Sequence, residues 1–319
     1  MAENIILDRN LTIEAVRVTE AAAIAAAETM GRVDEKIADQ AAVDAMRTAL
    51  NRLQMAGTVV IGEGERDEAP MLFIGEEGGT GNGPKIDIAL DPLEGTTITA
   101  KGMPNGLAVL ALSEHGGLLN APDVYMDKIA AGPLVPPGAI DLDNTAGENV
   151  ANVAKALGKD TKDVVACILD RPRHGELIAA VREAGARIVL IGDGDVAGVM
   201  ATAMPETGID LYMGTGGAPE GVLAAAALRC IGGNIQGRLL FRNDDERGRA
   251  AKVGVEDLNR KYEITDLASG DVIFAATGVT DGNMLQGVRR TAKYLSTESV
   301  AMRARTGTVR WIRMQHPIK

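Results

Sequence analysis

The chain has 319 residues, which fits one large domain or two ordinary ones at roughly 100 to 200 residues per domain. With 46% hydrophobic and 24% charged residues, its composition is that of a globular protein and excludes a disordered or collagen-like chain. A net charge of −11 and an aromatic content of 3% argue against nucleic acid, an anionic membrane or a ring-stacking carbohydrate platform as partner. An anionic substrate would need metal ions or locally placed arginines.

Cysteine usage and the start of the chain bear on where the protein works. The two cysteines, Cys167 and Cys230, lie in or beside apolar runs, which is typical of core thiols and not of a disulfide framework or a zinc site. The first residues lack a basic stretch followed by a long apolar one, and no apolar run is long enough to cross a membrane. We therefore expect a soluble, cytoplasmic protein.

The first part of the chain predicts two helices followed by strands. Residues 12–30 are alanine-rich and precede Gly31, and residues 41–54 place apolar side chains on one face at helical spacing, with Asp39 where an N-cap is expected. From residue 58 the residue pattern changes to short β-branched or apolar runs that end in acidic, glycine-rich turns. We expect strands of one sheet at residues 58–61, 86–90 and 107–112.

The Pro- and Gly-rich stretch 131–138 is the predicted domain boundary, which gives domains of residues 1–135 and 136–319. Beyond it strands alternate with helices, a pattern typical of an α/β domain whose parallel or mixed sheet is covered on both faces. We expect helices at 148–157, 176–184 and 222–230, strands at 164–169, 188–191 and 209–213, and strand-like runs again at 272–276 and 308–314.

Carboxylates cluster after three predicted strands, where ligands bind in open α/β sheets. The segments are residues 62–68 (GEGERDE), 91–97 (DPLEGTT) and 214–221 (GTGGAPEG). One acidic turn alone is more often a solvated turn or a helix cap. Several converging carboxylates repel one another, however, and a chain normally gathers them around a cation. Oxygen donors without Cys or His favour Mg²⁺ or Mn²⁺ over Zn²⁺.

The second segment carries a candidate nucleophile-activating hydroxyl. Pro92 fixes the chain direction after Asp91, and Gly95 lets the backbone approach a ligand, so Asp91 and Glu94 could face one metal while Thr96 faces the substrate. Beside a carboxylate and a metal, Thr96 could orient or deprotonate a water, as two-metal phosphatases require. The alternative is that Thr96 and its neighbour only cap the following segment.

Basic residues supply the other half of an anion site. Arg171 and Arg173 follow a predicted strand and open a helix, where the dipole and free N–H groups favour a phosphate, although an exposed basic loop is the alternative. Asp193 and Asp195, set between glycines, suit either sugar hydroxyls or the cap of the next helix. His174 is more consistent with a structural hydrogen bond than with catalysis.

Five motifs in order, at residues 61–71, 87–96, 171–174, 193–195 and 216–221, closely resemble the class II fructose-1,6-bisphosphatases over nearly the whole chain. The Asp-Pro-x-Glu-Gly-Thr element is also similar to the signature of the wider lithium-sensitive sugar and inositol phosphatase superfamily. The resemblance implies an α/β fold of the αβαβα five-layered sandwich type, with an N-terminal α+β domain that binds metal, a C-terminal domain that binds substrate, and the active site between them.

The resemblance also implies a reaction: metal-dependent hydrolysis of the 1-phosphate of fructose 1,6-bisphosphate to fructose 6-phosphate, in gluconeogenesis. It implies two or more Mn²⁺ or Mg²⁺ ions and a homodimer or homotetramer. Asp39 and Glu63 match ligands of one metal, and Asp91, Glu94 and Glu220 match ligands of the second. Thr96 matches the threonine that helps to activate the attacking water, with Glu63 and Asp91 beside it as catalytic carboxylates. The positions that match substrate contacts are Glu94, Gly95, Thr96, Tyr125, Arg171, Pro172, Arg173, Asp193, Gly194, Asp195 and Gly217.

The chain departs from the family pattern at two positions. Glu35 stands where family members carry a lysine near the first metal ligand, and Arg171 stands where some carry a lysine. The first change alters how the charge of the reacting phosphate is neutralised. The second keeps the charge and changes the donor geometry.

Four other functions stay open from the sequence. A dual fructose-1,6-/sedoheptulose-1,7-bisphosphatase and an inositol monophosphatase share the chemistry, and a pair of arginines for a distal phosphate favours a bisphosphate. A non-catalytic metal-binding module or sugar-phosphate sensor would keep the carboxylates, but Thr96 within the metal motif argues against it. A dinucleotide-binding enzyme is disfavoured, because no Gly-x-Gly-x-x-Gly lies between a strand and a helix with the downstream acid.

Overall fold

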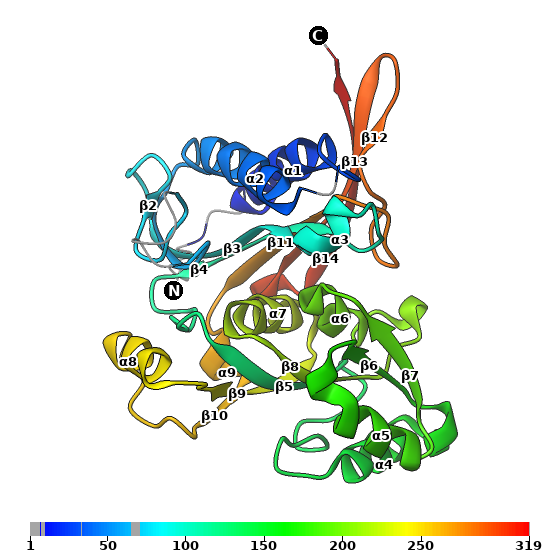
Figure 1. The fold of residues 1–319 in the computed structure, drawn as a ribbon. Coiled ribbons are helices and arrows are strands. Elements are labelled where there is room, and N and C mark those ends of the chain that lie inside the picture. The colour runs from blue at the N-terminus through cyan, green and yellow to red at the C-terminus, as the bar shows by residue number, and fades with distance from the viewer. Residues whose placement is uncertain (1–6, 8–9, 33, 65–70, 319) are drawn as a thin grey trace. The chain divides into compact units, whose positions relative to one another are not determined.

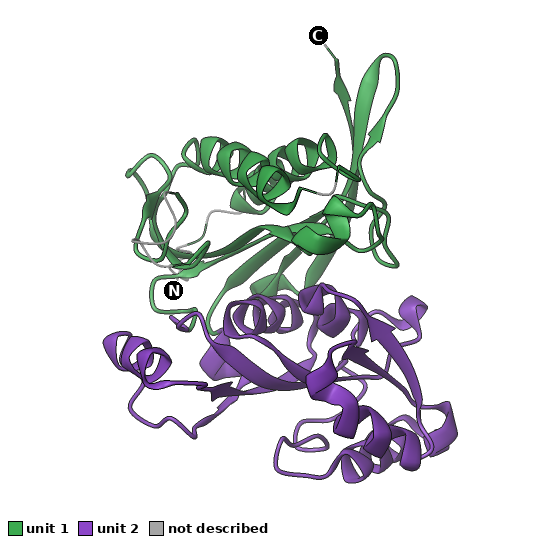
Figure 2. Cartoon of the chain, in the orientation of Figure 1, with its two compact units in different colours: residues 1–119, 269–319 green, residues 120–268 purple. Residues whose placement is uncertain are grey.

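The computed structural model describes residues 7, 10–32, 34–64 and 71–318 (Figure 1). The chain forms two compact units, Met1–Leu119 together with Ser269–Lys319, and Asn120–Ala268 (Figure 2). This division differs from the predicted boundary after residue 135. The C-terminal strands pair with the first sheet, and the strand Tyr125–Ala131 pairs within the second. The first unit is therefore assembled from both ends of the chain.

The first unit is built on a mixed sheet of eight strands in its described residues. Its strands are β1 (Ala56–Ile61), β2 (Glu77–Gly78), β3 (Lys85–Glu94), β4 (Leu107–Glu114), β11 (Val272–Gly278), β12 (Arg289–Arg290), β13 (Tyr294–Arg303) and β14 (Thr308–Pro317). The order is β12-β13-β11-β4-β3-β1-β2, with β14 on the other side of β13. β1 and β3 are parallel, and β4 runs antiparallel to β3. Strands β1 and β3 therefore end at the same edge.

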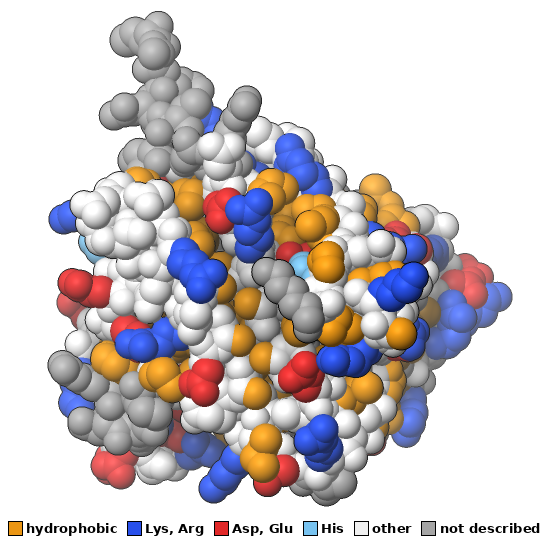
Figure 3. Space-filling view, turned by 90° about the horizontal axis from the view of Figure 1, so that it is seen from above, with side chains coloured by type: hydrophobic (Ala, Val, Ile, Leu, Met, Phe, Trp, Pro, Cys, Tyr) orange, Lys and Arg blue, Asp and Glu red, His pale blue; other side chains and the backbone are white. Residues whose placement is uncertain are grey.

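Helices α1 (Leu11–Ala27) and α2 (Glu35–Leu50) lie side by side over this sheet (Figure 1). Alanines dominate the buried side of α1, and their small side chains let the helix pack closely on β11, β13 and β4. The predicted N-cap of α2 is wrong. Asp34 caps the helix, since its side chain accepts a hydrogen bond from Ile37 N at 3.1 Å, and Asp39 lies inside the helix. Seen from above, acidic, basic and hydrophobic side chains are interspersed on this face (Figure 3).

The second unit has a six-stranded mixed sheet in the order β10-β9-β5-β8-β6-β7. Its strands are β5 (Tyr125–Ala131), β6 (Val165–Leu169), β7 (Arg187–Ile191), β8 (Leu211–Gly217), β9 (Asn234–Leu240) and β10 (Lys261–Glu263). Its helices are α4 (Ala146–Leu157), α5 (Gly175–Glu183), α6 (Asp195–Ala201), α7 (Ala218–Ile231), α8 (Asp244–Lys252) and α9 (Ile264–Leu267). The prediction of an α/β fold with a mixed sheet is confirmed: two mixed sheets with helices make a layered α/β fold.

One edge of the second sheet collects the segments of interest. β6 is parallel to β7 and β8, so all three end at this edge. β5 is antiparallel to its neighbours β8 and β9 and therefore begins there, with Tyr125 opposite both Gly217 and Leu240. Residues 214–217, predicted as a turn, continue β8 because they pair with β5. In open α/β sheets ligands bind beyond such an edge. Among the described residues, no helix is long and apolar enough to cross a membrane.

Candidate active site

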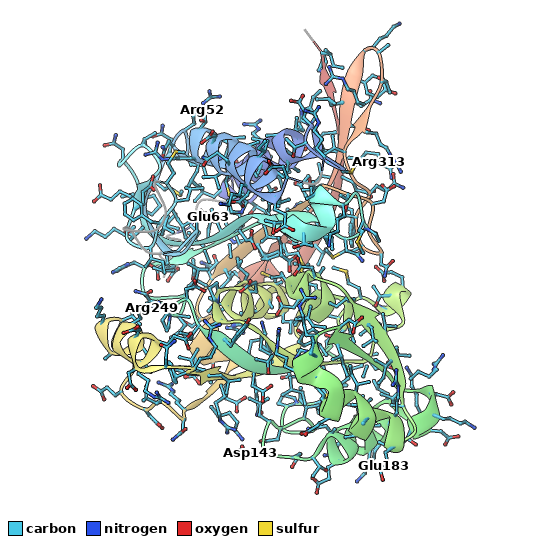
Figure 4. The ribbon with its side chains drawn as sticks, viewed as in Figure 1. Arg52, Glu63, Asp143, Glu183, Arg249 and Arg313 are labelled. Atoms are coloured by element: carbon cyan, nitrogen blue, oxygen red, sulfur yellow. The ribbon has the colours of Figure 1, made fainter. Side chains whose placement is uncertain are left out.

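The carboxyl ends of β1 and β3 carry three of the predicted acids. Glu63 follows β1 (Figure 4), and the last residues of β3 include Asp91 and Glu94. Contrary to prediction, β3 does not stop before Asp91. It continues through Pro92 with a register shift against β4, and Asp91 Oδ1 accepts a hydrogen bond from Leu93 N at 3.0 Å. The irregular strand end buries Glu94, which is 3% exposed.

Gly95 and Thr96 form the start of the short helix α3 (Thr96–Ala100). Gly95 has a φ of 89°, and a Cβ there would lie 2.7 Å from the side chain of Ile98, so only glycine fits without strain. The N-cap of α3 is Gly95, and the helix has no side-chain cap. The alternative that Thr96 serves as the cap is therefore not met. Thr96 is a half-buried residue and lies two positions after Glu94.

Asp39 comes to this region from α2, which packs against α3 and β3. Burial raises the pKa of the Asp39 carboxyl above its usual range. Glu35 lies one turn before Asp39 and is exposed. The predicted acidic segment 62–68 is described only to Gly64, and residues 65–70 lie outside the described part of the chain.

Two arginines follow β6 and reach toward both neighbouring strands. Arg171 donates through Nη1 to the carbonyl of Gly192, after β7, and its Nη2 lies 3.5 Å from Asp193 Oδ1. Arg173 donates through Nε and Nη2 to the carbonyl of Thr215, on β8, at 3.1 and 2.7 Å. Arg171 precedes a single 3-10 turn, Pro172–His174, which contains Arg173 and leads into α5. The positive groups thus lie at the carboxyl ends of three adjacent strands.

His174 is a structural hydrogen-bonding residue. It is buried, its Nδ1 lies 2.7 Å from the carbonyl oxygen of Leu169, and its Nε2 accepts from Thr215 N at 2.8 Å. Because a carbonyl only accepts, Nδ1 carries the proton and Nε2 is the acceptor. The ring links the end of β6 to β8. It therefore fixes the backbone of Thr215, whose carbonyl accepts the hydrogen bonds of Arg173.

Asp195 faces a buried lysine. Its backbone follows Gly194, whose φ of 82° turns the chain into α6. Lys128 Nζ donates to Asp195 Oδ2 and to the carbonyl of Gly217, the latter at 2.8 Å, and Tyr212 Oη donates to Asp195 Oδ2 at 3.4 Å. Lys128 is 1% exposed, so its ammonium group is buried and its charge is compensated by the Asp195 carboxylate. Sequence reasoning missed Lys128, because it predicted neither the strand β5 nor that a lysine on this strand would be buried.

Glu220 lies in the first turn of α7, directly after the end of β8. A Cβ at Gly217 would lie 1.9 Å from Glu220 Oε2, so the glycine leaves room for the carboxylate to fold back over the strand end. Glu220 Oε2 is buried and has no hydrogen bond within the described residues. Burial, together with the charge of Asp195, raises the pKa of Glu220 to about 7, and Lys128 opposes this shift.

Tyr125, at the start of β5, contacts two guanidinium groups. The guanidinium carbon of Arg173 lies 4.9 Å from the ring centroid, and that of Arg242 lies 4.8 Å from it. Such distances are within the range of cation–π contacts. Sequence analysis singled out Tyr125 only through the resemblance and did not find Arg242, because β9, the strand before it, was not predicted.

The predicted metal ligands fit a divalent cation in their donor chemistry. Glu94 is buried, Glu220 has a buried oxygen without a partner among the described residues, and the pKa of Asp39 is raised. Burying carboxylates is unfavourable unless a cation lies close to them, and hard oxygen donors suit Mg²⁺ or Mn²⁺. Within the part of the chain that the structure describes, no three His, Cys, Asp or Glu side chains form a preassembled metal-binding group. Four of the predicted acids belong to the first unit and Glu220 to the second.

Known proteins resemble this chain over nearly its whole length. A family model described as bacterial fructose-1,6-bisphosphatase, glpX-encoded, matches residues 9–316. Fructose-1,6-bisphosphatase 1 class 2 of Escherichia coli (strain K12) is 46% identical, covering 97% of this chain and 95% of that protein. D-fructose 1,6-bisphosphatase class 2/sedoheptulose 1,7-bisphosphatase of Synechococcus sp. (strain JA-3-3Ab) is 44% identical, covering 97% of this chain and 96% of that protein.

Proposed function

The chain belongs to the glpX-encoded bacterial fructose-1,6-bisphosphatase family. From this membership we propose which residues bind metal, activate water and bind substrate. The enzyme is a phosphoric monoester hydrolase that removes a phosphate from fructose 1,6-bisphosphate, leaving fructose 6-phosphate, in gluconeogenesis. The observation that carries this function is the family match across residues 9–316. The site residues, the identity of the ions and the assembly are the proposal.

The acids of the two units are proposed to hold two or more Mn²⁺ or Mg²⁺ ions. Asp39 and Glu63 would hold one, and Asp91, Glu94 and Glu220 would hold the second. The support is the burial of Glu94, the buried oxygen of Glu220 that has no hydrogen bond among the described residues, and the raised pKa of Asp39. When bound, the ions supply charge neutralisation and polarisation of the phosphoryl oxygens.

Thr96 is proposed to orient the attacking water and to pass its proton toward a carboxylate, Asp91 or Glu63. Its position at the open start of α3, two residues after Glu94 and without a capping role, supports this assignment. The water oxygen forms the new bond to phosphorus, the bond between phosphorus and the sugar oxygen breaks, and that oxygen leaves with a proton. Positioned help of this kind contributes about 10²- to 10⁴-fold to a rate.

The second unit is proposed to hold the substrate by its other phosphate and its hydroxyls. Arg171, Arg173 and Tyr125 lie at one sheet edge and suit the phosphate that is not hydrolysed. Asp193, with 28% of its side chain exposed, is better placed for a sugar hydroxyl than Asp195, whose carboxylate faces Lys128. The backbone positions proposed to contact substrate are Pro172, Gly194 and Gly217, together with Gly95 of the first unit.

Phosphate release from three substrates tests the function. Fructose 1,6-bisphosphate, sedoheptulose 1,7-bisphosphate and inositol 1-phosphate are each offered without metal, with Mn²⁺ and with Mg²⁺. We expect release from fructose 1,6-bisphosphate only when a divalent ion is present. Comparable release from sedoheptulose 1,7-bisphosphate would make the enzyme dual, and release from inositol 1-phosphate alone would contradict the assignment. We further propose that the enzyme is cytoplasmic and forms a homodimer or homotetramer. Sedimentation of the purified enzyme measures the oligomeric state.

A further inference from the structure

We propose that Arg242 is a further substrate-binding residue, which holds the unhydrolysed phosphate together with Arg173 beside the ring of Tyr125. The inference rests on the proposed function and adds a residue that neither the motifs nor the family resemblance singled out. All the residues that it involves belong to the second unit.

The strand order brings Arg242 to the substrate edge. β5 lies between β8 and β9, and Tyr125 at its start is opposite Gly217 of one neighbour and Leu240 of the other. Arg173 approaches the ring from the β8 side, where it is bonded to the carbonyl of Thr215. Arg242 follows the end of β9, which is the neighbour of β5 on the side away from β8. The two guanidinium groups therefore share one ring.

Two cations on one ring leave positive charge at this edge. Their carbons lie 4.9 and 4.8 Å from the same centroid. The charges are thus no further apart than about one Debye length, ~10 Å at 0.1 M salt, and of the two arginines Arg242 is paired with a carboxylate, that of Glu246. Arg173 has no carboxylate partner among the described residues, since both its hydrogen bonds go to a carbonyl. A dianionic phosphate would compensate the charge of Arg173 and could accept hydrogen bonds from both guanidinium groups.

Glu246 holds the Arg242 side chain in place, and some N–H donors of the guanidinium stay available to a ligand. Glu246 Oε1 accepts from Arg242 Nε at 2.6 Å and lies 2.5 Å from Nη2, and Oε2 accepts from Arg242 N at 2.6 Å. A guanidinium has five N–H donors, and those on Nη1 have no hydrogen bond within the described residues. The Arg242 side chain is 61% exposed, whereas that of Glu246 is 1% exposed. The carboxylate is therefore the buried anchor, and the guanidinium faces solvent.

The segment that carries this pair is itself tied to the start of β5. Asn243 caps α8 by accepting from Glu246 N at 2.9 Å, which fixes the first turn of the helix. Arg249 of α8 (Figure 4) donates through Nη2 to the carbonyl of Asp123, two residues before Tyr125. An arginine fixed before the ligand arrives loses little side-chain entropy on binding, so its contacts contribute more to affinity. This preorganisation distinguishes Arg242 from an ordinary surface arginine.

The test compares Arg242→Gln with a control from the same helix. Arg247→Gln removes an exposed arginine of α8 that pairs with Asp244 at 3.0 Å and whose guanidinium contacts no aromatic ring among the described residues. Binding of fructose 6-phosphate is measured by calorimetry, and kcat and KM are measured with fructose 1,6-bisphosphate. For Arg242→Gln we expect the Kd and the KM each to rise about tenfold, the scale of one charged hydrogen bond, with kcat changing far less. Arg247→Gln should match the wild type in all three.

A role limited to structure would give a different result. Wild-type Kd and KM in Arg242→Gln would overturn the proposal, as would a fall in kcat without a rise in KM. If Arg242→Gln does not fold, Arg242→Lys keeps the charge and the stem, and it should still raise both constants because lysine cannot form the fork. Wild-type Kd and KM in a folded Arg242→Lys would then overturn the proposal. Absence of phosphate release by the wild type would instead refute the proposed function, and this assignment with it.

Discussion

The two sheet edges that carry the predicted site residues have opposite character. In the first unit, the ends of β1 and β3 and the start of α3 present carboxylates and one threonine hydroxyl. In the second unit, two arginines contact the ring of Tyr125. Of the acids there, Asp195 is buried against Lys128 and Glu220 has a buried oxygen, whereas Asp193 keeps 28% of its side chain exposed. A carboxylate-rich edge suits cations and an arginine-rich edge suits phosphate. The difference indicates that hydrolysis and substrate anchoring have separate residues, which the following experiments test.

The largest effect is expected from removing a proposed metal ligand of the acidic edge. Asp91→Ala should abolish turnover in either Mn²⁺ or Mg²⁺ while the fold is retained, because removing one of several mutually repelling acids does not strain the metal-free protein. Phosphate release and thermal unfolding are measured together. Glu77→Gln, an exposed acid on β2, is the control and should keep its rate. Full activity of Asp91→Ala in excess metal would remove Asp91 from the site.

The next largest effect concerns Thr96. Thr96→Ala deletes the hydroxyl without touching a carboxylate, so kcat should fall on the order of a hundredfold, the scale of positioned acid–base help. The KM and the metal dependence should change little, and Thr96→Ser should keep part of the rate. The adjacent Thr97→Ala is the matched control. A near-wild-type kcat in Thr96→Ala would contradict the assignment of Thr96 to the attacking water. The acidic edge would then only bind metal.

A smaller effect, on binding and not on the chemical step, is expected at the basic edge. Arg173→Ala removes a charged donor near Tyr125, so KM for fructose 1,6-bisphosphate should rise about 10- to 100-fold, as expected for a hydrogen bond to a charged group. Steady-state kinetics give the two constants separately. A lowered kcat with unchanged KM would show that the basic edge takes part in the chemistry, and the contrast between the two edges would be lost.

The smallest effect on activity is expected at His174. His174→Ala leaves Thr215 N without its acceptor and the carbonyl of Leu169 without its donor, which costs about 1 to 3 kcal/mol of stability. The thermal midpoint should fall by a few degrees and kcat should stay within a few-fold of wild type. A hundredfold loss of kcat at unchanged thermal midpoint would instead make His174 catalytic.

Local sequence signals predicted much of the fold. The periodic helices were found because their apolar spacing and caps are encoded locally: Thr145 and Glu148 form a capping box at the start of α4, and Gly158 ends that helix in the left-handed region. Strands β1, β4, β6, β7 and β11 were found as short apolar runs. The acids at the strand ends were also visible, because glycine and proline mark the turns around them.

The strands that sequence analysis missed carry polar residues with distant partners. β5 contains Lys128, which is buried only because Asp195 lies against it, 67 residues away. In β9, Gln236 donates to Glu263 and accepts from Leu142 N, each at 2.9 Å, so a side chain typical of surfaces is buried. No window of neighbouring residues contains this information. The end of β3 was misjudged for a related reason, since β4 keeps pairing with it beyond Pro92.

The sequence by itself determined the α/β class and which acids and arginines are candidates for the site, because these depend on local spacing and on motifs read in order. Only the tertiary structure decided which of them share an edge. The boundary of the first unit, the burial of Asp195 and the approach of Arg242 to Tyr125 all follow from strand order. Strand order arises from pairing between segments far apart in the chain, where the free energy lies in contacts that no local pattern records.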